Sequence, residues 1–117
     1  MSVTKNFKLF VLDQLAELGN VSSRAMFGGV GLYQHEWFFG ILWDDKLFLK
    51  VDDKSRPSYE AEGMEVFRPY ANKPLTMSYY AVPLHVLEHA RALTDWARVA
   101  VQAARDSEKH PRRRRRT

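Results

Sequence analysis

The sequence predicts an α+β fold: one domain with a mostly antiparallel sheet of about six short strands, and helices at the N-terminus, in the middle and at the C-terminus. Short apolar runs rich in aromatic and β-branched residues follow one another between residues 24 and 51, separated by Gly-Gly and Asp-Asp pairs. Stretches with helical periodicity lie on both sides of these runs. A length of 117 residues with 45% hydrophobic residues suits a single core. The expected order is α-β4-α-β2-α.

The first predicted helix covers residues 4–18, where apolar residues recur at steps of three and four. Thr4 or Ser2 can cap its start, because a side-chain oxygen accepts a hydrogen bond from a free first-turn N–H. Gly19 can adopt the left-handed conformation that ends a helix.

Four strands are expected next, at residues 24–28, 30–35, 37–43 and 46–51, with the nearly continuous apolar run 37–43 in a central, buried position. Gly28, Gly29 and Gly31 permit positive φ or a close approach of two backbones. Successive strand side chains alternate between the two faces. The aromatic residues therefore form either a core on both faces or, on one face, a surface for a partner protein or a second copy of the chain.

The second half of the chain alternates between helical and extended patterns. Residues 52–63 predict a short helix capped by Ser55 or Asp53, with Pro57 in its first turn. Two strands follow at 66–70 and 75–80. A helical region begins at Pro83, can break near His89, and continues as one apolar stripe to residue 104.

Charge separates a domain at residues 1–105 from a tail at 106–117. The net charge is +4, but six of the 18 basic residues are Lys109 and Arg112 to Arg116, and without them the chain is mildly acidic. We expect the tail to be disordered. Its five arginines can pair with phosphates, but without interleaved aromatics they give weak, non-specific nucleic-acid contact. These residues are Arg112, Arg113, Arg114, Arg115 and Arg116.

Composition also limits location and chemistry. The absence of Cys excludes disulfides, thiolate catalysis and Cys-based metal sites. The N-terminus shows no long apolar stretch typical of a signal peptide, and no run approaches the roughly 18 apolar residues of a membrane span. We therefore expect a cytoplasmic protein.

Two motifs resemble known sites. Gly29-Val30-Gly31 begins like a dinucleotide-binding fingerprint, but Gln34 occupies the last glycine position and a strand follows instead of a helix, so we expect a structural role. The segment 85–89 matches the inverted zinc-protease pattern H-x-x-E-H, in which His85 and His89 would share one helix face. No third ligand is evident, and we expect two surface histidines.

Other polar residues fit turn chemistry. Asp44, Asp45, Asp52 and Asp53 stand at strand ends, where their side chains bond nearby backbone N–H groups. We predict no catalytic residue, no cofactor site and no metal site.

The motifs together resemble the TfoX N-terminal domain family, the first domain of a bacterial competence regulator. The resemblance spans about residues 5–104, and its most specific parts are an Arg-x-Met-Phe-Gly-Gly-x-Gly run and a Leu-Lys-Val-Asp run. The matching residues include Arg24, Met26, Phe27, Gly28, Gly29, Gly31, Lys50, Val51, Pro83 and Trp96.

This resemblance implies an α+β domain of the bacterial cytoplasm associated with regulation of DNA-uptake genes, and it supplies no catalytic residues. In the family this domain is followed by a further helical domain, whereas here an arginine tail follows, so we expect a stand-alone member. The sequence therefore favours a non-enzymatic regulatory domain that binds an unknown protein partner or forms a homodimer. The alternative is a nucleic-acid-associated accessory protein that uses the arginine tail.

Overall fold

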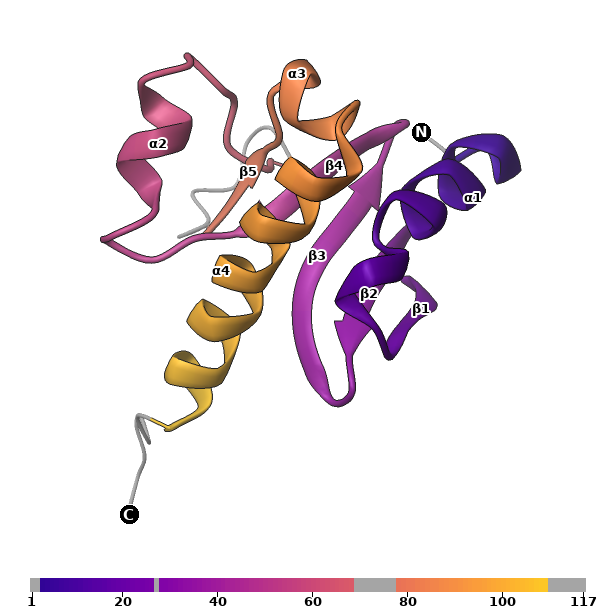
Figure 1. The fold of residues 1–117 in the computed structure, drawn as a ribbon, viewed down its shortest axis with the longest axis horizontal. Coiled ribbons are helices and arrows are strands. Elements are labelled where there is room, and N and C mark those ends of the chain that lie inside the picture. The colour runs from indigo at the N-terminus through magenta and orange to yellow at the C-terminus, as the bar shows by residue number, and fades with distance from the viewer. Residues whose placement is uncertain (1–2, 27, 69–77, 110–117) are drawn as a thin grey trace.

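The computed structural model describes residues 3–26, 28–68 and 78–109, and it has the predicted α+β fold (Figure 1). Its strands form one antiparallel sheet in the order β1-β2-β3-β4-β5. The strands are β1 (Val21–Met26), β2 (Gly29–Gln34), β3 (Trp37–Trp43), β4 (Lys46–Lys50) and β5 (Tyr79–Ala81). The helices are α1 (Lys5–Gln14), the 3₁₀ turn η1 (Ala16–Leu18), α2 (Arg56–Glu60), α3 (Leu84–Leu87) and α4 (Ala90–Lys109).

The helices pack against one face of the sheet, which we call the inner face. The long helix α4 crosses β3 and β4, with α1 beside it and α2 against β5 (Figure 1). The main core lies between these layers, and its fully buried members include Leu15, Phe39, Leu42, Leu49 and Leu93. Burial of these side chains is the dominant favourable contribution to folding.

The opposite, outer face carries a second, smaller core. Its buried residues are Ile41, Phe48, Phe67, Tyr79 and Ala81. A β-bulge creates this division, because the β2–β3 register shifts between Leu32 and Tyr33. Phe39 is the extra residue of β3, without a partner on β2, and its side chain faces the inner core. Ile41 faces outward with Phe38. Both faces therefore hold aromatic core residues, as the alternation argument allowed.

The start of the chain follows the sequence closely. The Thr4 hydroxyl accepts a hydrogen bond from the Phe7 backbone N–H at 3.2 Å and caps α1. The backbone N–H and the hydroxyl of Thr4 both donate to the Asp45 carboxylate, at 2.7 and 3.0 Å, and these hydrogen bonds connect the helix to the β3–β4 hairpin. Gly19 has φ 79° and follows η1.

Several boundaries differ from those expected. The predicted capping of α2 is wrong, because neither Ser55 nor Asp53 caps the helix through its side chain. Instead, the Asp52 side chain accepts hydrogen bonds from the backbone N–H groups of Lys54 and Ser55, just before the helix. The strand expected at 66–70 is a single bridge from Val66 to Tyr80, and residues 69–77, which include parts of both expected strands, lie outside the described residues.

The final helix also differs from the predicted boundary. It continues to Lys109, past the limit at residue 105, so residues 106–109 are helical and not disordered. Each added helical residue gains a backbone hydrogen bond once the helix is nucleated. An i,i+4 hydrogen bond from the Gln102 amide to Asp106, at 2.9 Å, supports this extension.

Candidate functional site

The outer face of the sheet is the most distinctive surface of the described residues. The five strands contain three charged residues, Arg24, Lys46 and Lys50, and all are basic. Each pairs across the sheet with an outward-facing position, so all three lie on the outer face. This face therefore combines aromatic rings with positive charge.

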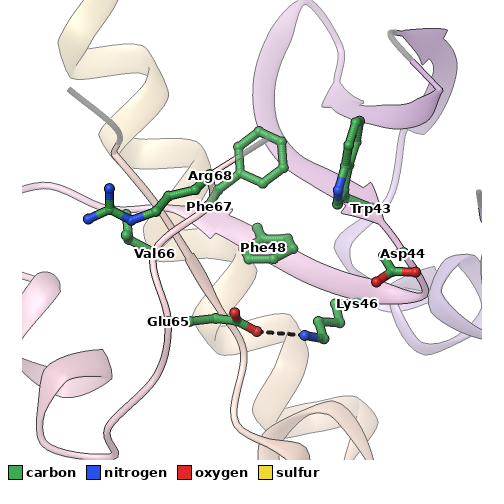
Figure 2. A pocket seen from close by; sticks show the side chains of 8 residues that line it. All are labelled: Trp43, Asp44, Lys46, Phe48, Glu65, Val66, Phe67 and Arg68. Carbon is green, nitrogen blue, oxygen red and sulfur yellow. Dashed lines mark hydrogen bonds and ion pairs between the residues drawn. The ribbon is translucent and has the colours of Figure 1, made fainter. Parts of the chain in front are cut away.

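At the β3–β4 hairpin the outer face holds a hollow of about 510 Å³, which we call the aromatic hollow (Figure 2). The rings of Trp43, Phe48 and Phe67 gather around it. Phe67 packs edge-on against Trp43, with ring centroids 5.6 Å apart, and tilted against Phe48 at 5.0 Å. Asp44 and Arg68 stand on opposite sides of the rings. This volume lies in the range typical of ligand and anchor pockets.

Backbone pairing positions the Phe67 ring. The Phe67 N–H donates to the Tyr79 carbonyl at 2.9 Å, and the Ala81 N–H donates to the Glu65 carbonyl at 2.9 Å. Residues 65–67 thereby lie along β5, on the side away from β4. The small, outward-facing Ala81 leaves room for the Phe67 ring to reach β4 and β3.

An ion pair closes one side of the aromatic hollow. The Lys46 Nζ atom lies 2.8 Å from a Glu65 carboxylate oxygen, and both side chains are about half-exposed (Figure 2). This hydrogen bond, with the nearby negative charge, raises the pKa of Lys46 above its ordinary value. The ammonium is therefore charged at neutral pH and is not available as a nucleophile or base.

A second feature, which we call the cation–aromatic row, crosses the other end of the outer face. It runs from Arg24 on β1 through the rings of Tyr33, Phe38 and Tyr79 to Lys50 on β4. The Tyr33 and Phe38 centroids are 5.1 Å apart, and those of Phe38 and Tyr79 are 5.5 Å apart. The Arg24 guanidinium lies 5.3 Å from the Tyr33 centroid, and the Lys50 Nζ lies 5.2 Å from that of Tyr79.

The remaining larger depressions are different in character. One of about 540 Å³ lies between α2 and the end of α4 and is lined mainly by charged and polar residues. A crevice of about 200 Å³ separates α2 from α4, where Tyr59 packs edge-on against Trp96 at 4.8 Å. Burial raises the pKa of Tyr59, so its phenol is neutral. Neither of these two depressions is lined by three aromatic rings, unlike the aromatic hollow.

The glycines of the Gly-x-Gly motif serve the sheet geometry, as predicted. Gly28 has φ 84° in the β1–β2 turn. A Cβ atom on Gly29 would lie 2.6 Å from the Leu42 carbonyl oxygen, and one on Gly31 would lie 2.6 Å from the Met26 sulfur. Both values are shorter than real Cβ contacts. A strand follows, so this motif has no helix N-terminus for a phosphate.

The two histidines of the H-x-x-E-H segment are exposed, as expected. They do not share a helix face, because α3 ends at Leu87 and His89 lies between α3 and α4. His85 Nε2 pairs with Glu62 at 2.9 Å, while His89 Nδ1 lies 2.8 Å from the His85 carbonyl oxygen. Within residues 3–26, 28–68 and 78–109, no group of three or more His, Asp or Glu side chains could hold a metal ion.

The acidic residues at strand ends lie in turns, but the expected bonding to nearby backbone N–H groups is seen at Asp52, whereas the Asp45 carboxylate accepts from the distant Thr4 and Asp53 pairs with the Arg56 side chain. Asp44 and Asp45 have φ 54° and 55°, and they connect β3 to β4 as a two-residue hairpin loop. The Asp52 side chain accepts hydrogen bonds from the N–H groups of Lys54 and Ser55. Although partial burial of Asp52 favours a higher pKa, these hydrogen bonds outweigh it and lower the pKa below its ordinary value.

The other family-motif residues have identifiable structural contacts. Val51 is buried, and its N–H donates to the Ser78 carbonyl at 2.7 Å. Pro83 precedes α3, and Trp96 on α4 covers Tyr59. Phe27 and the tail arginines Arg112 to Arg116 lie outside the described residues, so their predicted roles stay predictions.

The comparison with known families agrees with this architecture. The family model of the TfoX N-terminal domain matches residues 13–104, which includes all five strands and most of α4. The chain belongs to the TfoX N-terminal domain family. A search of curated proteins found no match. Within the described part of this family member, no helix has both the length and the apolar character needed to cross a membrane.

The sequence allowed an aromatic binding surface that includes Phe38, Trp43 and Tyr79, but it located neither the aromatic hollow nor the cation–aromatic row. Arg24, Lys50 and Phe67 stood out only as family-motif residues, and Phe48 only as a strand residue. Their convergence depends on the bulge in β3 and on the bridge at Val66. Alternation of hydrophobic residues, the available signal, does not reveal either one.

Proposed function

We propose that this member of the TfoX N-terminal domain family is a non-catalytic regulatory domain that binds a protein partner through the aromatic hollow. The observation that carries the proposal is the grouping of three aromatic rings around a hollow of about 510 Å³. No described helix packs over these rings, whose cluster consists of strand residues with Phe67 and Met64. An apolar or aromatic side chain of the partner would be the anchor.

The chemistry of the hollow favours binding over catalysis. Aromatic residues dominate the energetics of protein interfaces, because they bury a large area at a small entropic cost. The charged rim, formed by Lys46, Glu65, Asp44 and Arg68, carries both signs and suits the polar border of an interface. The Lys46–Glu65 pair neutralises two of these charges.

Affinity capture with matched variants tests the proposal. Trp43→Ala removes the half-buried ring that forms one wall of the hollow, and Val99→Ala truncates an apolar side chain, 49% exposed on α4, far from it. Wild-type and Val99→Ala chains should retain the same bound protein, and Trp43→Ala should lose it. Equal retention by all three chains would contradict the proposal.

The oligomeric state needs a separate measurement. Sedimentation equilibrium of the wild-type and Trp43→Ala chains will show whether the hollow binds a second copy. A dimer that dissociates in Trp43→Ala identifies the partner as this chain itself. A wild-type monomer leaves a different protein as the expected partner.

A further inference from the structure

We propose that the cation–aromatic row is a binding site for single-stranded nucleic acid. The proposal concerns the opposite end of the outer face from the aromatic hollow and goes beyond protein binding. It also differs from the expectation for the arginine tail, because the row interleaves positive charges with aromatic rings on a folded surface.

The row has the pattern that single-stranded nucleic acids require. Bases stack on aromatic rings or on arginine planes, while cations pair with the backbone phosphates. Tyr33 and Phe38 are half-buried and present part of their rings, and the exposed Arg24 guanidinium lies over Tyr33. Tyr79 is 8% exposed and supports Phe38 from the side.

Charge complementarity favours a polyanion over an apolar partner here. Arg24 and Lys50 stand at the two ends of the row, and no strand residue of the sheet is acidic. Burial, with a smaller contribution from Tyr33, raises the pKa of Tyr79, so this phenol adds no negative charge. Phosphates on either side of a stacked base could therefore contact a cation.

A depression beside the row provides space for a base. It has a volume of about 200 Å³ and lies between the sheet and the end of α4, bordered by Phe38, Tyr79 and Lys50, by Trp37 and Glu36, and by Ala104 and Ser107 of α4. Glu36 is exposed at the β2–β3 turn. A carboxylate at this position can accept a hydrogen bond from an exocyclic amino group of a base, as glutamates do in nucleic-acid readout.

Single-stranded recognition follows from the shape of the surface. The exposed cation and the partly exposed rings project from a sheet face, where unpaired bases can reach them, whereas a duplex keeps its bases stacked inside. We therefore expect a single strand to bind more tightly than a duplex of the same sequence.

The test uses the 117-residue chain with Arg112 to Arg116 replaced by serine, so that these arginines do not contribute. Fluorescence anisotropy measures its binding to a labelled single-stranded DNA of about 12 nucleotides, a length within the range of known single-strand sites. Arg24→Glu should raise Kd at least about tenfold and reduce the salt dependence, because it removes a phosphate contact. Tyr33→Leu should weaken binding about tenfold by removing a stacking ring.

Arg91→Glu is the matched control, because Arg91 is exposed on α4 and the charge change is identical. It should change Kd by no more than about twofold, since it lies outside the row. Circular dichroism of each variant checks that it is folded. If Tyr33→Leu unfolds, Arg24→Glu still tests the proposal, because Arg24 is exposed and its replacement leaves the core unchanged. Undetectable binding by the tail-neutral chain, equal losses in Arg24→Glu and Arg91→Glu, or equally tight duplex binding would each overturn the proposal.

Discussion

Substitution of Gly29 by alanine should destabilise the fold, because the added methyl group meets neighbouring atoms of the sheet. The added Cβ would lie 2.6 Å from the Leu42 carbonyl oxygen and 2.8 Å from the Trp43 ring. The carbonyl belongs to the central strand β3 and cannot move without disturbing the sheet. Overpacking of this kind costs about 1–3 kcal/mol.

Part of this cost is offset in the unfolded chain. Alanine loses less backbone entropy than glycine on folding, a gain of about 0.5–1 kcal/mol in a strand. The net loss in the free energy of unfolding should be about 0–2.5 kcal/mol, with a midpoint near 1 kcal/mol. For a chain of this size 1 kcal/mol corresponds to a fall in Tm of about 4 °C.

Urea denaturation and thermal melting measure the effect, with Gly31→Ala as the comparison. A Cβ on Gly31 would also be 2.6 Å from its nearest atom, but that atom is the Met26 sulfur at the end of a flexible side chain. Gly31→Ala should therefore cost less than Gly29→Ala. The reasoning is refuted if Gly29→Ala is as stable as the wild type, or more stable than Gly31→Ala.

Four further substitutions, one of them a control, test individual contacts. Thr94 is 1% exposed and its hydroxyl has no hydrogen-bond partner among the described residues, so the isosteric Thr94→Val should raise stability by about 1 kcal/mol in urea denaturation. Asp45→Gly should cost about 1–2 kcal/mol because it loses both bonds from Thr4. Asp44→Gly, at the same backbone conformation but without such bonds, should cost little in the same melts. Asp52 has a lowered pKa, so its ionised form stabilises the fold above its unfolded pKa of about 3.9, and this contribution disappears as pH falls through the folded value. Asp52→Asn should therefore be less stable than the wild type at neutral pH, and the difference should shrink under acid denaturation conditions; a difference independent of pH would contradict this.

The sequence predicted elements wherever local chemistry is decisive. Thr4 caps α1 through a side-chain oxygen, and Gly19 adopts positive φ after η1. The Asp44-Asp45 pair forms the β3–β4 turn, because short polar side chains tolerate this backbone. Such preferences act over a few residues, so they are visible in the sequence alone.

Predictions were less accurate where several local options compete. Ser55, Asp53 and Asp52 can all accept hydrogen bonds from nearby backbone N–H groups, and in the structure Asp52 does so, from Lys54 and Ser55 just before α2. The apolar stripe ends at residue 104 and predicts the end of the helix near there, but α4 continues to Lys109. Amphipathicity marks only the part of a helix that packs against a core.

The sequence by itself determined the fold class, the family and the structural role of its glycines. The tertiary structure alone decided the faces of the sheet. Strict alternation would place Ile41 and Trp43 with Phe39, but the bulge at Phe39 turns both outward. A bulge is set by how two strands pair over their whole length, and one strand's sequence does not encode it. That pairing produces both the aromatic hollow and the cation–aromatic row, so the surfaces proposed for binding emerge only when the chain is folded.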